Sequence, residues 1–143
     1  MSHPDLGALL NALLPYAQQM LEKHGEFFPF AASMSSAGEI ALAASYSGDE
    51  HPESQAVIDL SIQGLRERAT RGEIRASGVC VDVRAIAPGQ SKKTDAIETR
   101  LEHANGEAVN VFLPYQKGFR GKLKYGDIFA SSGTPSVFAH DVG

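Results

Sequence analysis

The chain lacks several features that would point to a particular class of protein. Its 143 residues include no tryptophan and a single cysteine, Cys80, so no intramolecular disulfide can form and a reducing, cytoplasmic setting is favoured. No apolar run approaches the ~18 residues needed to cross a bilayer. Asp5 also stands where a signal peptide would carry basic residues. We therefore expect a cytoplasmic protein with no membrane partner.

Positive charge is also scarce. The formal net charge is -4, which gives no reason to expect a dedicated nucleic-acid-binding protein. The imbalance is local, because residues 1–74 contain 10 acidic and 4 basic side chains, whereas residues 75–143 contain 7 and 9. A basic segment lies in the second part and consists of Lys117, Arg120, Lys122 and Lys124. With Phe119 it could contact phosphates and stack on bases, but we interpret it as a solvated loop.

No spacing of side chains identifies a catalytic, metal or cofactor site. Cys80 has no histidine on its predicted face, so we expect a structural thiol rather than a nucleophile. Residues 49–53 crowd acids and a histidine before a helix, where acids already interact favourably with the helix N-terminus. Residues 89–94 lack the second glycine of a phosphate loop. Three histidines lie in terminal or loop contexts and define no cluster: His3, His24 and His140. We expect no catalytic residue, metal or cofactor.

The clearest pattern in the chain is a pair of antiparallel connections between residues 79 and 115. The second connection contains Asn105-Gly106, which usually closes a two-residue turn. That register would place Leu101 opposite Asn110 and mix polar with apolar side chains on each face. A three-residue loop with a left-handed Gly106 gives one continuous apolar face, so we predict that register. Its pairs are Leu101–Val109, Thr99–Val111 and Ile97–Leu113.

The strand before these two alternates valines with polar residues. We predict that Val79, Val81 and Val83 face the core, and that Cys80 shares the opposite face with the charged side chains. That face is either an open antiparallel surface or a polar docking surface for a partner, with an aromatic anchor. The residues of this predicted polar face are Asp82, Arg84, Glu98, Arg100, Asn110 and Phe112.

Helical spacing and turn signals organise the rest of the chain. A helix is predicted from residue 4 to Gly25, with Pro15 as an interruption, and a second helix to about Arg71, ended by Gly72. Strands over 27–34 and 39–46 would form a first hairpin.

We therefore predict one α+β domain over residues 1–143. Its order is helix, two strands, helix, three strands, with an antiparallel sheet packed by the two helices and a loop-rich segment over residues 117–143.

This order of elements resembles the roadblock and wider profilin-like fold, by topology, over residues 5–116. Members of that fold typically act as dimeric, non-enzymatic adaptors or regulators, so the resemblance implies an interaction role with self-association or a protein partner. We expect a small non-catalytic interaction or regulatory module. The alternatives are a small-molecule-binding protein or enzyme that uses the polar sheet face, and a weak nucleic-acid accessory protein acting through residues 117–124.

Overall fold

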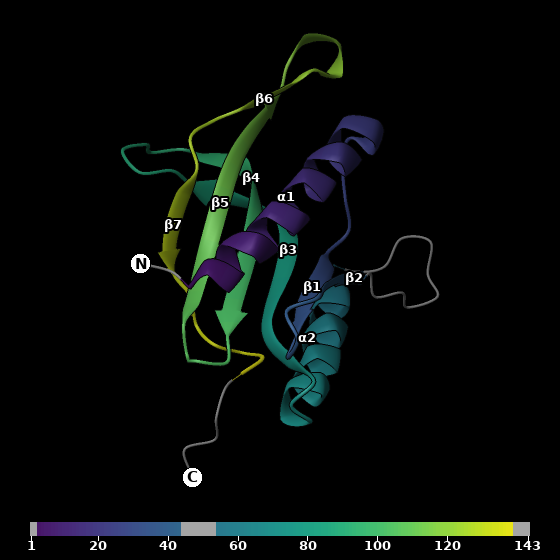
Figure 1. Ribbon diagram of the computed structural model, residues 1–143. Coiled ribbons are helices and arrows are strands. Elements are labelled where there is room, and N and C mark those ends of the chain that lie inside the picture. The colour runs from purple at the N-terminus through teal and green to yellow at the C-terminus, as the bar shows by residue number, and fades with distance from the viewer. Residues whose placement is uncertain (1–2, 44–53, 139–143) are drawn as a thin grey trace.

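An antiparallel sheet lies between two helices in the computed structural model of the chain, which describes residues 3–43 and 54–138 (Figure 1). The predicted α+β class is confirmed. The elements are α1 (Pro4–His24), β1 (Phe30–Ser35), β2 (Ile40–Ala43), α2 (Ser54–Thr70), β3 (Ile74–Ile86), β4 (Lys93–His103), β5 (Ala108–Lys117), a 3-10 turn (Phe119–Gly121), β6 (Leu123–Tyr125) and β7 (Phe129–Ser132).

The strands follow the order β2-β1-β3-β4-β5 across the sheet, and β6 and β7 both pair with the outer edge of β5. β7 runs beside residues 109–112 and β6 beside residues 115–117. The segment that we expected to be loop-rich therefore contributes two short strands. Their pattern was too brief to read, since each has only three or four residues.

The first helix is continuous through Pro15, whose side chain lies on the solvent-exposed side. Gly25 ends it in a left-handed conformation with φ of 75°, as predicted. His3 caps the start of α1, because its Nδ1 atom accepts the backbone N–H of Asp5 at 3.1 Å. Pro4 occupies the first helical turn, where its missing N–H costs nothing.

The hairpin predicted around Asn105-Gly106 is confirmed. Gly106 has a φ of 100°, and the backbone N–H of His103 donates to the carbonyl of Glu107. Leu101 lies opposite Val109, and the pairs Thr99–Val111 and Ile97–Leu113 follow.

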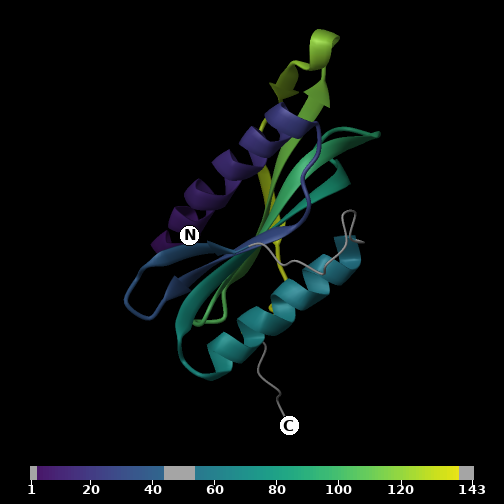
Figure 2. The same cartoon turned by 90° about the vertical axis from the view of Figure 1, so that its right-hand side faces the viewer.

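Both faces of the sheet are covered, because α1 packs on one and α2 on the other (Figure 2). The predicted orientation of β3 is therefore wrong. Val79 lies opposite Arg100 and packs under α2, whereas Cys80 lies opposite Thr99 and packs under α1. Residues opposite each other in a sheet point the same way, so the valines do not share a face with Leu101. A central strand that is buried on both sides carries no alternation of polar and apolar residues, so its sequence does not show which side chains face which helix.

Gly78 allows α1 to approach β3 closely. A Cβ at this position would lie 2.4 Å from Leu13 Cδ1 and 3.1 Å from Leu101 Cδ2. Gly64 in α2 has no such role, because it is exposed and a Cβ there would have no neighbour within 4 Å.

Candidate functional site

The residues of the predicted polar face do not lie on one surface. Asp82 lies opposite Ile97 on the α1 side of the sheet, and Arg84 lies opposite Asp95. Glu98 and Arg100 lie opposite Val81 and Val79 on the α2 side, together with Asn110 and Phe112 of β5. The error follows from the orientation of β3. The prediction that these residues form a single docking surface is therefore wrong, because they form two groups on opposite sides of the sheet.

The α2-side group is largely engaged within the chain. The carboxylate of Glu98 accepts from the guanidinium of Arg100 at 2.8 Å and its side chain is only 10% exposed. The ring of Phe112 stacks on Phe129 of β7, with centroids 4.9 Å apart and planes 8° apart. The ring is therefore half-covered by the chain's own C-terminal part rather than open to a partner.

Glu102 is a buried carboxylate near the end of β4, on the same side of the sheet as Glu98 and Arg100. It accepts the backbone N–H groups of Ser136, Val137 and Phe138, and the hydroxyl of Ser136. Val137 is buried with residues of α2 and the central strands. Glu102 therefore holds residues 136–138 against the sheet, because charge-assisted hydrogen bonds from backbone amides are among the strongest available.

Cys80 is buried at the centre of the α1 core. Burial raises the pKa of its thiol to about 12, although its neighbour Thr99, at 3.7 Å, acts in the opposite direction. A thiol with so high a pKa is protonated at neutral pH and is a poor nucleophile. The burial of Cys80 agrees with a structural role, although Cys80 packs under α1 and does not share a face with Glu98 and Arg100 as predicted.

The basic segment is divided among three places. Lys124 lies in β6 beside a cleft, whereas Arg120 is in the 3-10 turn, where its guanidinium carbon lies 5.3 Å from the ring centroid of Phe119. Lys117 and Lys122 are exposed on the β5–β6 hairpin. Because Lys117 pairs with Leu123 and Lys124 pairs with Gln116, the side chains of Lys117 and Lys124 point to opposite faces of the hairpin. Residues 49–53 and His140 fall outside the part of the chain that the structure describes.

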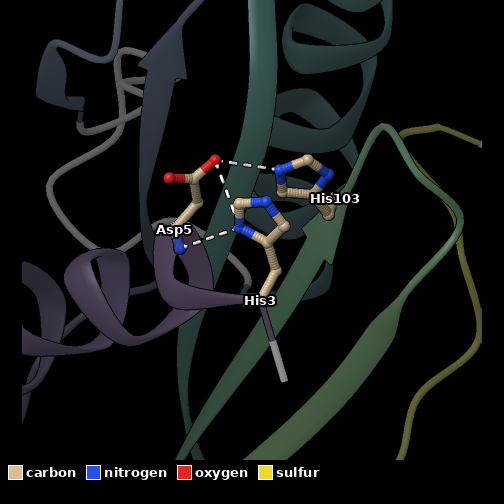
Figure 3. Close-up of side chains that lie close together, drawn as sticks. All are labelled: His3, Asp5 and His103. Atoms are coloured by element: carbon tan, nitrogen blue, oxygen red, sulfur yellow. Dashed lines mark hydrogen bonds and ion pairs between the residues drawn. The ribbon is translucent and has the colours of Figure 1, made fainter. Parts of the chain in front are cut away.

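A cluster of His3, Asp5 and His103 joins the start of α1 to the end of β4 (Figure 3). Asp5 Oδ2 lies 2.9 Å from His103 Nε2 and 3.4 Å from His3 Nδ1, and the two imidazole rings stack with centroids 4.1 Å apart. Arg75 of β3 completes the set, with Nε and Nη2 on the two carboxylate oxygens. The hydrogen bond from His103, and then Arg75, hold the pKa of Asp5 below its ordinary value. The expectation that His3 belongs to no cluster is wrong.

The same three residues offer ligand atoms within 4.8 Å of one another, as a metal site would. Their nitrogen lone pairs are in use, however, since Nδ1 of His3 accepts from the amide of Asp5 and Nδ1 of His103 accepts from the amide of Asn105. A guanidinium on Asp5 adds a positive charge that a divalent cation would have to displace. In this arrangement the cluster anchors α1 to the sheet. Sequence reasoning missed it because the residues are 98 positions apart, and no local spacing links them.

A second hydrogen-bonded pair, between buried Tyr115 and exposed Asp82, lies at the other end of the same face. The hydroxyl of Tyr115 donates to Asp82 Oδ1 at 2.6 Å. Burial raises the pKa of Asp82, and burial followed by the bond to Asp82 raises the pKa of Tyr115. The hydrogen bond fixes the position of Tyr115, which lines the neighbouring cleft.

A cleft of about 820 Å³ lies at one end of the sheet, between the β3–β4 connection and the strands β5 and β6. The backbone N–H of Gln90 donates to the carbonyl of Ala87 and closes the turn of that connection, in which Gly89 has a positive φ of 78°. Across the cleft, the N–H of Gly126 donates to the carbonyl of Pro114 at 2.8 Å, which holds residues 126–129 in place. Sequence reasoning could not find the cleft, because its walls come from three separated segments.

Comparison of the chain with protein-family models, with curated proteins and with solved structures found no match. Neither helix of the described residues, 3–43 and 54–138, has the length and apolar character needed to cross a membrane.

Proposed function

We propose that this chain is a small non-catalytic interaction module that pairs with a second copy of itself through the edge of β2. The observation that carries the proposal is that the outer edge of β2 is exposed and, within residues 3–43 and 54–138, unpaired. Among the described residues β2 pairs only with β1, and all four of its residues are exposed. Ile40 is 37% exposed and Leu42 is 48% exposed. Apolar side chains on an unpaired strand edge favour pairing with another strand.

The register of this pairing follows from the orientation of the side chains. Leu42 lies opposite Ala32 and Ile40 opposite Met34, so both side chains point to the α1 side of the sheet. A two-fold axis perpendicular to the sheet keeps that side common to both copies. Ile40 then lies opposite the partner's Leu42, and Ala41 lies opposite its own symmetry mate. Large apolar side chains meet on one face and small ones on the other, so the edge is self-complementary.

A non-catalytic role is supported by the way in which the chemistry-bearing groups are used. Cys80 is buried with a raised pKa, and Asp5 is bound by Arg75 and His103. Each of these groups stabilises the fold rather than facing a substrate. The likeness to the roadblock and profilin-like fold stays a prediction, and the proposal does not rest on it. A cytoplasmic location is part of the proposal and is supported by the single cysteine.

Sedimentation of three proteins tests the pairing. The wild type should sediment as a dimer, and Leu42→Lys should be monomeric, because a lysine opposite Ile40 of the partner would bury an unpaired charge. Leu60→Lys is the matched control, since Leu60 is 45% exposed on α2, away from the edge. It should remain a dimer. A monomeric wild type, or equal effects of the two substitutions, would refute the proposal.

A cysteine variant tests the register. Ala41→Cys should form an intermolecular disulfide under mild oxidation, because residues opposite each other bring their Cβ atoms to about 4.5–5.5 Å. Ala37→Cys, in the exposed β1–β2 turn, is the control and should remain reduced. The native Cys80 is buried and does not compete.

A further inference from the structure

The cleft at the opposite end of the sheet carries a charge that differs from that of the whole chain. Three lysines and one acid, Asp127, line it, whereas the chain as a whole has a net charge of -4. The lysines come from separate segments of the fold. Lys92 and Lys93 lie at the end of the β3–β4 connection, and Lys124 lies in β6. The fold therefore concentrates positive charge around one concavity, which would attract an anion.

The lining between these charges is apolar. Pro114 is buried in β5, and the ring of Phe129 is held by its stack on Phe112. Ile128 is 53% exposed at the opening. Tyr115 and Tyr125 also line the cleft, and both pack against the α1 core. A wall of side chains fixed by packing and strand pairing is preformed, which lowers the cost of binding.

We infer that the cleft binds a small amphipathic anion, in which a carboxylate, sulfonate or phosphate is attached to an aromatic or branched apolar body. The apolar body would lie against Pro114, Ile128 and Phe129, and the anionic group would lie toward Lys92, Lys93 and Lys124. The volume of about 820 Å³ falls in the usual range for such ligands, about 300–1,000 Å³. This inference goes beyond the proposed self-pairing and is independent of it, because the β2 edge lies across the sheet.

Fluorescence titration with anilinonaphthalene sulfonate, an aromatic anion, provides the first test. The wild type should bind it saturably at one site per chain. Lys124→Glu should weaken binding about five- to tenfold, because it removes one attraction and adds one repulsion at a solvent-exposed site. Lys122→Glu is the matched control. It makes the same charge change two residues away but does not line the cleft, and it should change affinity less than about twofold.

The neutral analogue phenylnaphthylamine separates charge from apolar contact. Lys124→Glu should leave its binding unchanged, whereas Ile128→Ser should weaken it about threefold or more, because apolar surface at the opening is lost. Leu60→Ser removes an equally exposed side chain from α2 and should have no effect. All of these side chains are exposed, so the unfolding curves of the variants should match that of the wild type.

Several results would overturn the inference. Equal losses in Lys122→Glu and Lys124→Glu would show attraction by overall charge only, and the absence of a saturable site would show that the cleft holds no ligand of this class. Loss of probe binding in the Leu42→Lys variant would show that the probe binds at the β2 edge. A preference for a single-stranded oligonucleotide that depends on Phe119, at the tip of the hairpin, would indicate nucleic-acid binding instead. None of these outcomes decides whether the chain dimerises.

Discussion

The two edges of the sheet are treated in opposite ways. The β5 edge is covered along most of its length, because β7 pairs with residues 109–112 and β6 with residues 115–117. The β2 edge has no second strand among residues 3–43 and 54–138, and its apolar residues are exposed. Both edges belong to one sheet. They differ because the C-terminal strands β6 and β7 pair with β5 and not with β2.

Under the proposed self-pairing, the difference between the two edges would limit indiscriminate association. An unpaired edge is a template for any extended strand, and covering it removes that template. The β5 edge is long, and residues 129–138 protect it, with Glu102 holding their end. The β2 edge has only four residues, which limits what can pair with it to a well-matched strand. A specific partner and the absence of general aggregation are compatible in this arrangement.

The largest effect should come from removing the carboxylate that holds the covering segment. Glu102→Ala leaves the amides of Ser136 and Val137 without their acceptor, and we expect the free energy of unfolding to fall by about 2–3 kcal/mol. Glu102→Gln keeps one acceptor oxygen and should lose about half as much. Urea unfolding measures both. Amide exchange should accelerate at residues 129–138 and remain unchanged in β1 and β2, which would separate the two edges. Uniform acceleration would contradict a local role.

A smaller effect is expected from the ring that fixes β7 to β5. Phe129→Ala removes the stack on Phe112, and we expect a loss of about 1–2 kcal/mol, since it combines pair geometry with partial burial. Phe119→Ala is the matched control, because that ring is 84% exposed. Its unfolding free energy should lie within about 0.5 kcal/mol of the wild type. If the two variants lose the same stability, the covered edge does not depend on this stack.

The fold could be predicted from the sequence where a pattern was local and one-sided. The register at Leu101–Val109 followed from the apolar face of two adjacent strands, and the helix end at Gly25 from its basic last turn and glycine. The orientation of β3 could not be predicted, because six consecutive residues of this strand, from Ala76 to Val81, are buried and show no alternation of buried and exposed positions. A valine is equally suited to either face of a strand covered on both.

The sites were less accessible than the fold. His3, Asp5 and His103 meet because α1 lies across the sheet, and Glu102 meets Ser136 because the chain returns to the α2 side after β7. The cleft likewise depends on three segments converging. Such contacts depend on tertiary packing, and no spacing within a single element encodes them.

The smallest predicted effect is that of low pH, which should weaken the contacts between the start of α1 and the β4–β5 hairpin before those of β1 and β2. The backbone N–H of His3 donates to Glu107, and His103 and Arg75 bind Asp5, so the start of the chain is tied to the β4–β5 hairpin. The pKa of Asp5 is lowered, chiefly by the hydrogen bond with His103. A carboxylate with a lowered folded pKa adds stability that is fully present above its unfolded pKa, near 3.8, and is lost as the pH falls through the folded value.

Unfolding measured between about pH 5 and about pH 3 should therefore show a steeper loss of stability for the wild type than for Asp5→Asn. Asp82 provides a control of opposite sign. Burial raises its pKa, so its ionised form opposes folding, and the Asp82→Asn variant should lose more stability on acidification than the wild type. Amides of the β4–β5 hairpin should exchange faster at low pH while those of β1 and β2 do not. An equal pH dependence in all three proteins would show that the Asp5 cluster does not tie α1 to the covered side of the sheet.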